Sequence, residues 1–121
     1  MTDPTSDGII NMEIIASLRE LGGDDDPGLV VELIDLYLQD APERIREIQE
    51  AIAGEDFDLL ERAAHTLKSS SANIGALGLS SMCAELEGLA RTKDITDVTA
   101  HGQSSAQTYA DVEKALTAIK G

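Results

Sequence analysis

Apolar residues recur three and four positions apart in successive segments of the chain, which is the spacing of one face of an α-helix. The first segment predicts a short helix after Asn11 that stops at Gly22 and carries four apolar residues on one side, Ile14, Ile15, Leu18 and Leu21. Longer helices are predicted at about 27–40, 42–53, 56–73, 78–92 and 103–120. No segment alternates apolar and polar residues as a strand does, so we expect an all-α protein.

Helix-breaking residues divide the later segments. Pro42 lies inside an apolar stripe, so we expect a bend or a brief break near residue 41. Gly102 is expected to interrupt the weak pattern before the last helix. Three alternative caps precede it, namely Asp94, Thr96 and Asp97.

The acidic run 24–26 followed by Pro27 is typical of a helix start, with Asp26 as the N-cap and Pro27 in the first helical position. The three carboxylates could instead bind a metal ion, but no further ligands follow at the spacing of a calcium loop. We therefore prefer the helix start, because negative charge is favourable at the positive end of a helix dipole.

Amphipathic helices joined by short links bury their apolar stripes most simply as an antiparallel four-helix bundle, here with a short additional N-terminal helix. At 121 residues the chain is long enough for one core but not for two. We expect a flexible N-terminus at residues 1–8, one domain at residues 9–121, and a monomer.

The charge of the chain excludes several kinds of partner. Twenty-three acidic residues against nine basic ones leave no basic face for nucleic acid or an anionic membrane. The single Phe, two Tyr and no Trp provide no platform on which bases could stack. No run approaches the roughly 18 apolar residues of a spanning helix, and residues 1–8 carry no secretion signal. We expect a cytoplasmic protein.

The helix predicted at 56–73 carries an exposed histidine. Its inward stripe consists of small and apolar residues, Leu60, Ala64, Leu67, Ser71 and Ile74. His65 points away from that stripe, on the same exposed arc as Asp58, Arg62, Ser69 and Ala72, and Lys68 lies one turn along and slightly towards the core. An ordinary solvated histidine is the simplest interpretation, but the small residues around it leave a surface flat enough for another protein to approach.

The segment 64–76 resembles the signature of histidine-containing phosphotransfer (HPt) domains of two-component phosphorelays. That signature reads His-x-Leu-Lys-Gly-Ser-Ser with a Gly-Ala pair downstream, and here the chain reads His65-Thr66-Leu67-Lys68-Ser69-Ser70-Ser71 with Gly75-Ala76. Ser69 is the clear departure, because the family usually has glycine there. The resemblance extends over residues 27–90, and it implies the four-helix-bundle fold.

The resemblance also implies a chemistry. His65 would accept a phosphoryl group from an aspartyl phosphate on a receiver domain and pass it to an aspartate of another receiver. Lys68 would stabilise the phosphoryl oxygens, and the docking surface would include Arg62, Ser69 and Ala72. The partners would be receiver domains of response regulators or a hybrid histidine kinase. Mg²⁺ would belong to the receiver, so we expect no cofactor, no metal site and no kinase activity in this chain.

Several alternatives compete with these assignments. The bundle could be a helical binding module without phosphotransfer, and Glu61 with His65 could begin a metal site, although two ligands do not complete one. A histidine-kinase dimerisation helix is disfavoured because Thr66, not an acidic residue, follows the histidine. Arg62 could simply pair with Asp58 four residues earlier.

Two residues outside the motif receive structural assignments. Cys83 lies among apolar residues at helical spacing, so it is interpreted as a core thiol. His101 is interpreted as a surface or capping residue, because it lies next to Gly102.

Overall fold

The computed structural model describes residues 9–23 and 28–120. These residues form five α-helices and no strand: α1 (Met12–Gly22), α2 (Leu29–Ala53), α3 (Phe57–Asn73), α4 (Leu77–Thr92) and α5 (Ile95–Lys120). The prediction of an all-α protein is confirmed. None of these helices is both long enough and apolar enough to cross a membrane.

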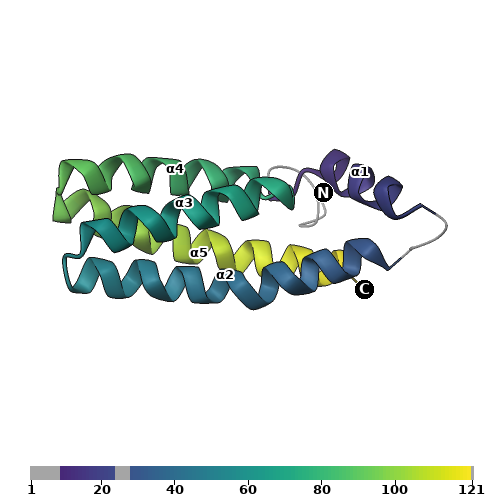
Figure 1. Ribbon diagram of the computed structural model, residues 1–121, viewed down its shortest axis with the longest axis horizontal. Coiled ribbons are helices and arrows are strands. Elements are labelled where there is room, and N and C mark those ends of the chain that lie inside the picture. Colours follow the sequence, from purple (N-terminus) through teal and green to yellow (C-terminus); the bar gives the residue numbers. More distant parts are fainter. Residues whose placement is uncertain (1–8, 24–27, 121) are drawn as a thin grey trace.

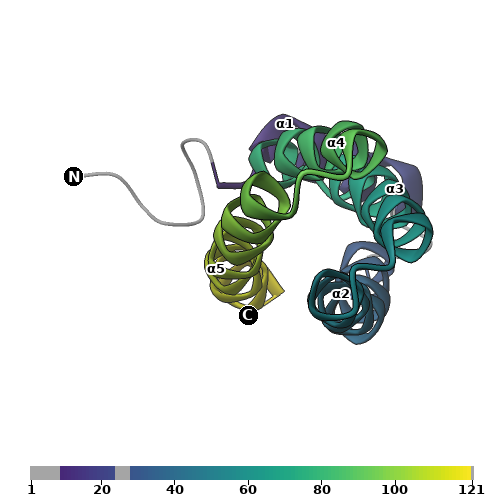
Figure 2. The same cartoon turned by 90° about the vertical axis from the view of Figure 1, so that its left-hand side faces the viewer.

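The four long helices lie side by side, and each reverses the direction of the one before it (Figure 1). Helix α3 packs between α2 and α4, and α5 contacts both α2 and α4, so the four helices surround one interior (Figure 2). Helix α1 lies beyond one end of α3 and α4 and contacts α2. This arrangement is consistent with the expected bundle and its additional N-terminal helix.

All four long helices contribute fully buried side chains to the interior, including Ile34, Ile48, Leu60, Leu67, Leu79, Leu86, Val112 and Leu116. Burying each such side chain contributes roughly 1.5–3 kcal/mol, so this core is the main source of stability. Two hydroxyl groups inside it satisfy each other, because Tyr37 Oη and Ser71 Oγ are 2.8 Å apart. Burial raises the pKa of Tyr37 above its usual range.

Side-chain caps begin three of the helices. The carboxamide oxygen of Asn11 accepts hydrogen bonds from the backbone N–H groups of Glu13 and Ile14, as predicted for the start of α1. The carboxylate of Asp56 accepts from Leu59 N–H at the start of α3. Of the three alternatives before α5, Asp94 is the cap, because its carboxylate accepts from the N–H groups of residues 96 and 97.

The prediction of two helices separated near residue 41 is wrong, because α2 is one helix over this whole region. It continues without interruption through Pro42, which lies on its exposed side. A proline inside a helix costs about 3 kcal/mol. Residues on both sides of it are buried in the same core, including Tyr37, Ala41 and Ile48, and their burial outweighs that cost.

The predicted interruption at Gly102 and the predicted start of the last helix near residue 103 are both wrong. The helix begins at Ile95 and runs through Gly102, which is buried against α2. A Cβ atom at this position would lie 2.4 Å from Ile52 Cδ1, so the lack of a side chain leaves room for the end of the Ile52 side chain of α2. The glycine is therefore a packing residue, not a helix breaker.

Two further predictions concern the N-terminal part of the chain. Leu21 is expected on the inner side of the first helix but is exposed, because α1 projects past the end of the core. The predicted cap at Asp26, the helix start at Pro27 and the flexible segment 1–8 lie outside the described residues. Within the described part, α2 begins at Leu29, two residues later than predicted.

Candidate functional site

Helix α3 holds His65 at its outer surface. The predicted stripe of Leu60, Ala64, Leu67 and Ser71, with Ile74 at the end of the helix, is buried, which fixes the rotation of the helix about its axis. That rotation leaves the His65 side chain 59% exposed and Lys68, one turn later, 32% exposed. Both orientations agree with the predictions from helical spacing.

Glu87 of α4 joins the two predicted site residues. Its carboxylate Oε2 lies 3.0 Å from His65 Nδ1, and its other oxygen, Oε1, lies 2.6 Å from Lys68 Nζ. The Glu87 side chain is only 12% exposed, so the two neighbours provide most of its polar contacts. The packing of α4 on α3 thus holds an imidazole and an ammonium group on one carboxylate.

The contact with Glu87 decides which imidazole nitrogen of His65 carries the lone pair. An ionised carboxylate only accepts hydrogen bonds, so Nδ1 carries the proton of the neutral ring. The lone pair is then on Nε2, on the opposite side of the ring from Glu87. An accessible nitrogen lone pair next to an ammonium group can attack an electrophile whose negative charge the ammonium stabilises.

The charge of Glu87 is maintained by its neighbours. The hydrogen bond from Lys68 lowers the pKa of this carboxyl group, and the contact with His65 acts in the same direction, whereas burial opposes both. The carboxylate therefore stays ionised at neutral pH. Its role as acceptor for Nδ1–H is consistent with that state.

Two more charged residues extend this cluster. Arg91 of α4 places Nη2 3.3 Å from the carboxylate of Glu61 and 3.7 Å from that of Glu87. Glu61 thus pairs with Arg91 and not with His65, which does not favour the alternative of a metal site begun by Glu61 and His65. Across the described residues, no three potential ligands of the His, Cys, Asp or Glu type gather at metal-binding distance.

The residues predicted for docking lie along the exposed side of α3, outside the Glu87 cluster. Ser69 is exposed and Ala72 is half-buried. Arg62 is exposed, and its Nε donates to the backbone carbonyl of Asp58 at 3.4 Å. The suggested pairing of Arg62 with the Asp58 carboxylate is therefore replaced by a contact with the main chain.

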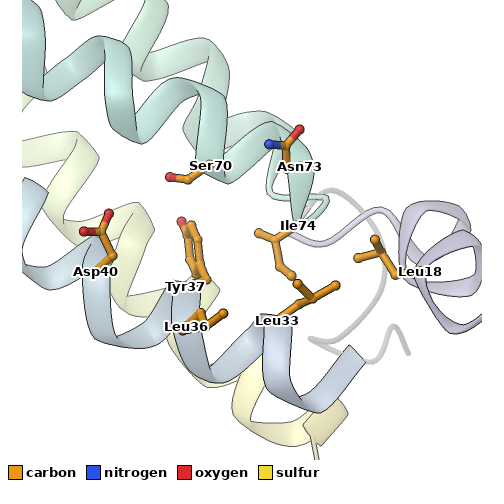
Figure 3. Close-up of a pocket in the computed structure, with 8 residues that line it drawn as sticks. All are labelled: Leu18, Leu33, Leu36, Tyr37, Asp40, Ser70, Asn73 and Ile74. Atoms are coloured by element: carbon orange, nitrogen blue, oxygen red, sulfur yellow. The ribbon is translucent and has the colours of Figure 1, made fainter. Parts of the chain in front are cut away.

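A hollow of about 320 Å³ flanks α3 on the side facing α2 (Figure 3). Its walls come from α1, α2 and the end of α3, and are formed by Leu18, Leu33, Leu36, Tyr37, Asp40, Ser70, Asn73 and Ile74. In Figure 3, Tyr37 and Leu33 point from α2 towards Ser70 and Ile74. The hollow is mainly apolar and separate from the charged cluster.

Glu87 is the residue at this site that the sequence did not reveal as important. It follows Leu86, which is fully buried, and precedes Ala90 by three positions, so the helical pattern places it at the edge of the apolar stripe of α4. That edge position was the available signal. It indicates contact with a neighbouring helix but not with which side chains.

A model of the Hpt domain family matches residues 32–121. The chain belongs to the Hpt domain family. The match covers α3, α4, α5 and most of α2, and so includes the whole histidine cluster. No protein of curated function matches the sequence significantly.

Solved structures of histidine-containing phosphotransfer proteins resemble this Hpt domain closely. HptB of Pseudomonas aeruginosa PAO1 is 29% identical with a TM-score of 0.86, and the match covers 95% of this chain and 96% of that one. ZmHP2 of maize is 25% identical with a TM-score of 0.82, over 93% and 83% of the two chains. A putative histidine-containing phosphotransfer protein of rice is 25% identical with a TM-score of 0.80, over 91% and 79%. Family and fold together assign this chain a phosphotransfer role in a phosphorelay.

Proposed function

We propose that His65 is the phosphoacceptor of this Hpt domain and relays a phosphoryl group between aspartates of receiver domains. The observation that carries the proposal is the contact of His65 Nδ1 with Glu87, which leaves the Nε2 lone pair free on an exposed ring that shares this carboxylate with Lys68. On this proposal the protein is a monomeric phosphocarrier without a nucleotide site, built as an antiparallel four-helix bundle that presents the histidine from α3.

The transfer step uses the Nε2 lone pair. It attacks the phosphorus of the receiver's aspartyl phosphate, an N–P bond forms, and the P–O bond to the aspartate breaks with its electron pair remaining on the carboxylate. The ring becomes positively charged, and Glu87 stabilises this charge through Nδ1–H, as a buried carboxylate does in other histidine-based sites. The return step reverses these changes towards the aspartate of a second receiver.

Lys68 stabilises the charge that spreads over the phosphoryl oxygens in a loose transition state. Mg²⁺ would act from the receiver's acidic site, so the chain needs no cofactor of its own. Arg62, Ser69 and Ala72 would meet the receiver, because they share the exposed side of α3 with His65. The small side chains at 69 and 72 leave room for the receiver's active site to reach Nε2.

The test is incubation with a phosphorylated receiver domain from the same organism. The wild-type protein should gain an acid-labile, base-stable phosphate that mass spectrometry maps to His65, and His65→Gln should gain none. His101→Gln serves as the matched control and should be labelled like the wild type. ATP alone should label none of the three proteins.

Phosphate that persists in His65→Gln would overturn the assignment of the acceptor. A wild-type protein that binds receiver domains but never becomes labelled would instead support the alternative function, a helical binding module without phosphotransfer.

A further inference from the structure

Four charged side chains form a row across the surface shared by α3 and α4. Lys68 and Glu87 are joined at 2.6 Å, and Glu87 and Arg91 approach to 3.7 Å. Arg91 is held by Glu61 at the end of the row, with Nη2 at 3.3 Å and Nε at 3.4 Å from the same oxygen. Arg91 therefore lies between two carboxylates and contacts the outer one more closely.

Phosphorylation would change the charge balance of this row. In the resting state Lys68 and Arg91 balance Glu61 and Glu87, and the form of His65 that can attack is the neutral ring with its proton on Nδ1. Attaching a phosphoryl group to Nε2 adds two negative charges on its oxygens and one positive charge on the ring. The net change is one negative charge, and Lys68 now has two anionic neighbours instead of one.

The two carboxylates that share Arg91 differ in how well water can solvate them. The Glu87 side chain is 12% exposed, whereas that of Glu61 is 37% exposed. Leaving a carboxylate without a counter-charge costs more where less water reaches it. If Lys68 turns towards the phosphoryl group, Glu87 keeps only the phosphorylated ring as a close cationic partner, and the phosphoryl oxygens offset the charge of that ring. Glu87 therefore gains more from Arg91 than Glu61 gains by keeping it.

We propose that Arg91 is a positioning residue that moves from Glu61 to Glu87 when His65 is phosphorylated and so frees Lys68 for the phosphoryl group. The inference rests on the proposed function, because it needs phosphate on His65. Arg91 acts through Glu87 and Lys68 and does not itself need to touch the phosphate. Glu61 holds Arg91 in the resting state and competes with the exchange.

This exchange predicts opposite effects for removing Arg91 and for removing Glu61. Without Arg91, Glu87 retains Lys68, and the phosphorylated state is less stable. Without Glu61, Arg91 is already available to Glu87, and the phosphorylated state is more stable. Because Glu61 acts only through Arg91, removing Glu61 should have no effect once Arg91 is gone.

The experiment measures how phosphate distributes at equilibrium between this protein and a receiver domain that phosphorylates the wild type. The ratio compares separated proteins, so contacts made only during docking do not affect it. The variants are Arg91→Gln, Glu61→Gln and the double variant. Arg46→Gln is the matched control, because Arg46 pairs with Glu43 and Glu50 on α2, away from His65.

We expect Arg91→Gln to shift phosphate towards the receiver by about twofold to fivefold, the effect of one partly exposed ion pair. Glu61→Gln should shift it the other way, the double variant should match Arg91→Gln, and Arg46→Gln should match the wild type. An unchanged ratio in Arg91→Gln would overturn the exchange. An effect of Glu61→Gln that persists in the double variant would also overturn it, because Glu61 would then act directly on the phosphate.

A second measurement follows Arg91 itself after the protein is phosphorylated with phosphoramidate, a small donor that needs no receiver. The Nε–H signal of Arg91 in a ¹⁵N–¹H spectrum, assigned by its absence in Arg91→Gln, should move on phosphorylation, and that of Arg46 should not. An unmoved Arg91 signal in a protein with phosphate on His65 contradicts the exchange but leaves the proposed function intact. Failure of the wild type to accept phosphate from either donor would contradict the proposed function.

Discussion

His65 and His101 each contact a carboxylate of the same helix, α4, yet they use their ring nitrogens differently. His65 uses Nδ1 to contact Glu87 and leaves Nε2 free. His101 uses both nitrogens, Nδ1 with the backbone carbonyl of Asp97 and Nε2 with the carboxylate of Glu85 at 3.2 Å. Both contacts of His101 are hydrogen bonds only if both nitrogens carry protons, and such a ring has no lone pair to donate.

The carboxylates differ as well. Glu87 is nearly buried and shared with Lys68, whereas Glu85 is 62% exposed and, among residues 9–23 and 28–120, forms an ion pair only with His101. One histidine therefore has a free nitrogen, a fixed ring and a nearby ammonium group. The other is an inter-helix contact between α4 and α5. On the proposed mechanism, a histidine near a carboxylate is not sufficient for phosphotransfer, because the nitrogen that the carboxylate contacts decides whether a lone pair remains at the other nitrogen.

The largest effect is expected from blocking access to His65. Ser69→Arg replaces a small exposed residue one turn after the histidine with a long cationic one, and it should reduce phosphotransfer from a receiver to background. The helix should remain intact, because arginine is a better helix former than serine. Receiver binding and phosphotransfer are measured together with circular dichroism.

Ser104→Arg is the matched control for this variant, because it introduces the same change on the exposed side of α5, three residues after His101. It should transfer phosphate at the wild-type rate. Normal transfer by Ser69→Arg would place the docking surface elsewhere on the bundle.

A smaller effect is expected from removing the ammonium group that only the His65 site has. Lys68→Ala should slow phosphotransfer about 10²-fold under single-turnover conditions, as expected for the loss of one preorganised electrostatic contact. The folding free energy should change by at most about 1 kcal/mol at neutral pH, because the Lys68–Glu87 pair is partly exposed. A transfer rate equal to that of the wild type would remove Lys68 from the site.

The stability cost of Lys68→Ala should also depend on pH with a defined sign. Lys68 holds the pKa of Glu87 below its ordinary value, so the pair stabilises the fold above the pKa of an unfolded glutamate, about 4.3. This contribution is lost as the pH falls through the lowered pKa of the folded protein. The difference in melting temperature between wild type and Lys68→Ala should therefore shrink below about pH 4.

The parts of this molecule that the sequence predicted are those set by local rules. The cap at Asp56, the buried stripe of α3 and the outward direction of His65 all follow from a period of 3.6 residues. The two wrong helix boundaries, at Pro42 and Gly102, come from residues with strong local preferences that packing overrides. At Gly102 the reason is a contact with Ile52, 50 positions away, which no local pattern contains.

The site shows the same division. His65 and Lys68 were predictable because they share one helix and one motif, whereas Glu87 reaches them from α4. Both Glu85 and Glu87 lie outside the buried stripe of α4, and nothing in their immediate neighbourhood shows that one faces α3 and the other α5. The difference between the two histidines is therefore a property of helix packing.

The smallest effect is expected from changing His101 itself towards the state of His65. In a His65→Gln background, Glu85→Ala removes the group that contacts His101 Nε2 and leaves Nδ1 on the Asp97 carbonyl. The freed nitrogen then resembles Nε2 of His65, and phosphoramidate should phosphorylate His101 slowly, at a level detectable by mass spectrometry. A phosphorylated receiver should still give no label, because His101 has neither the ammonium partner of His65 nor its motif. Equal labelling of His101 by phosphoramidate with and without Glu85 would show that the contact of Glu85 with Nε2 does not cause the difference in reactivity between the two histidines. Accessibility alone would then explain that difference.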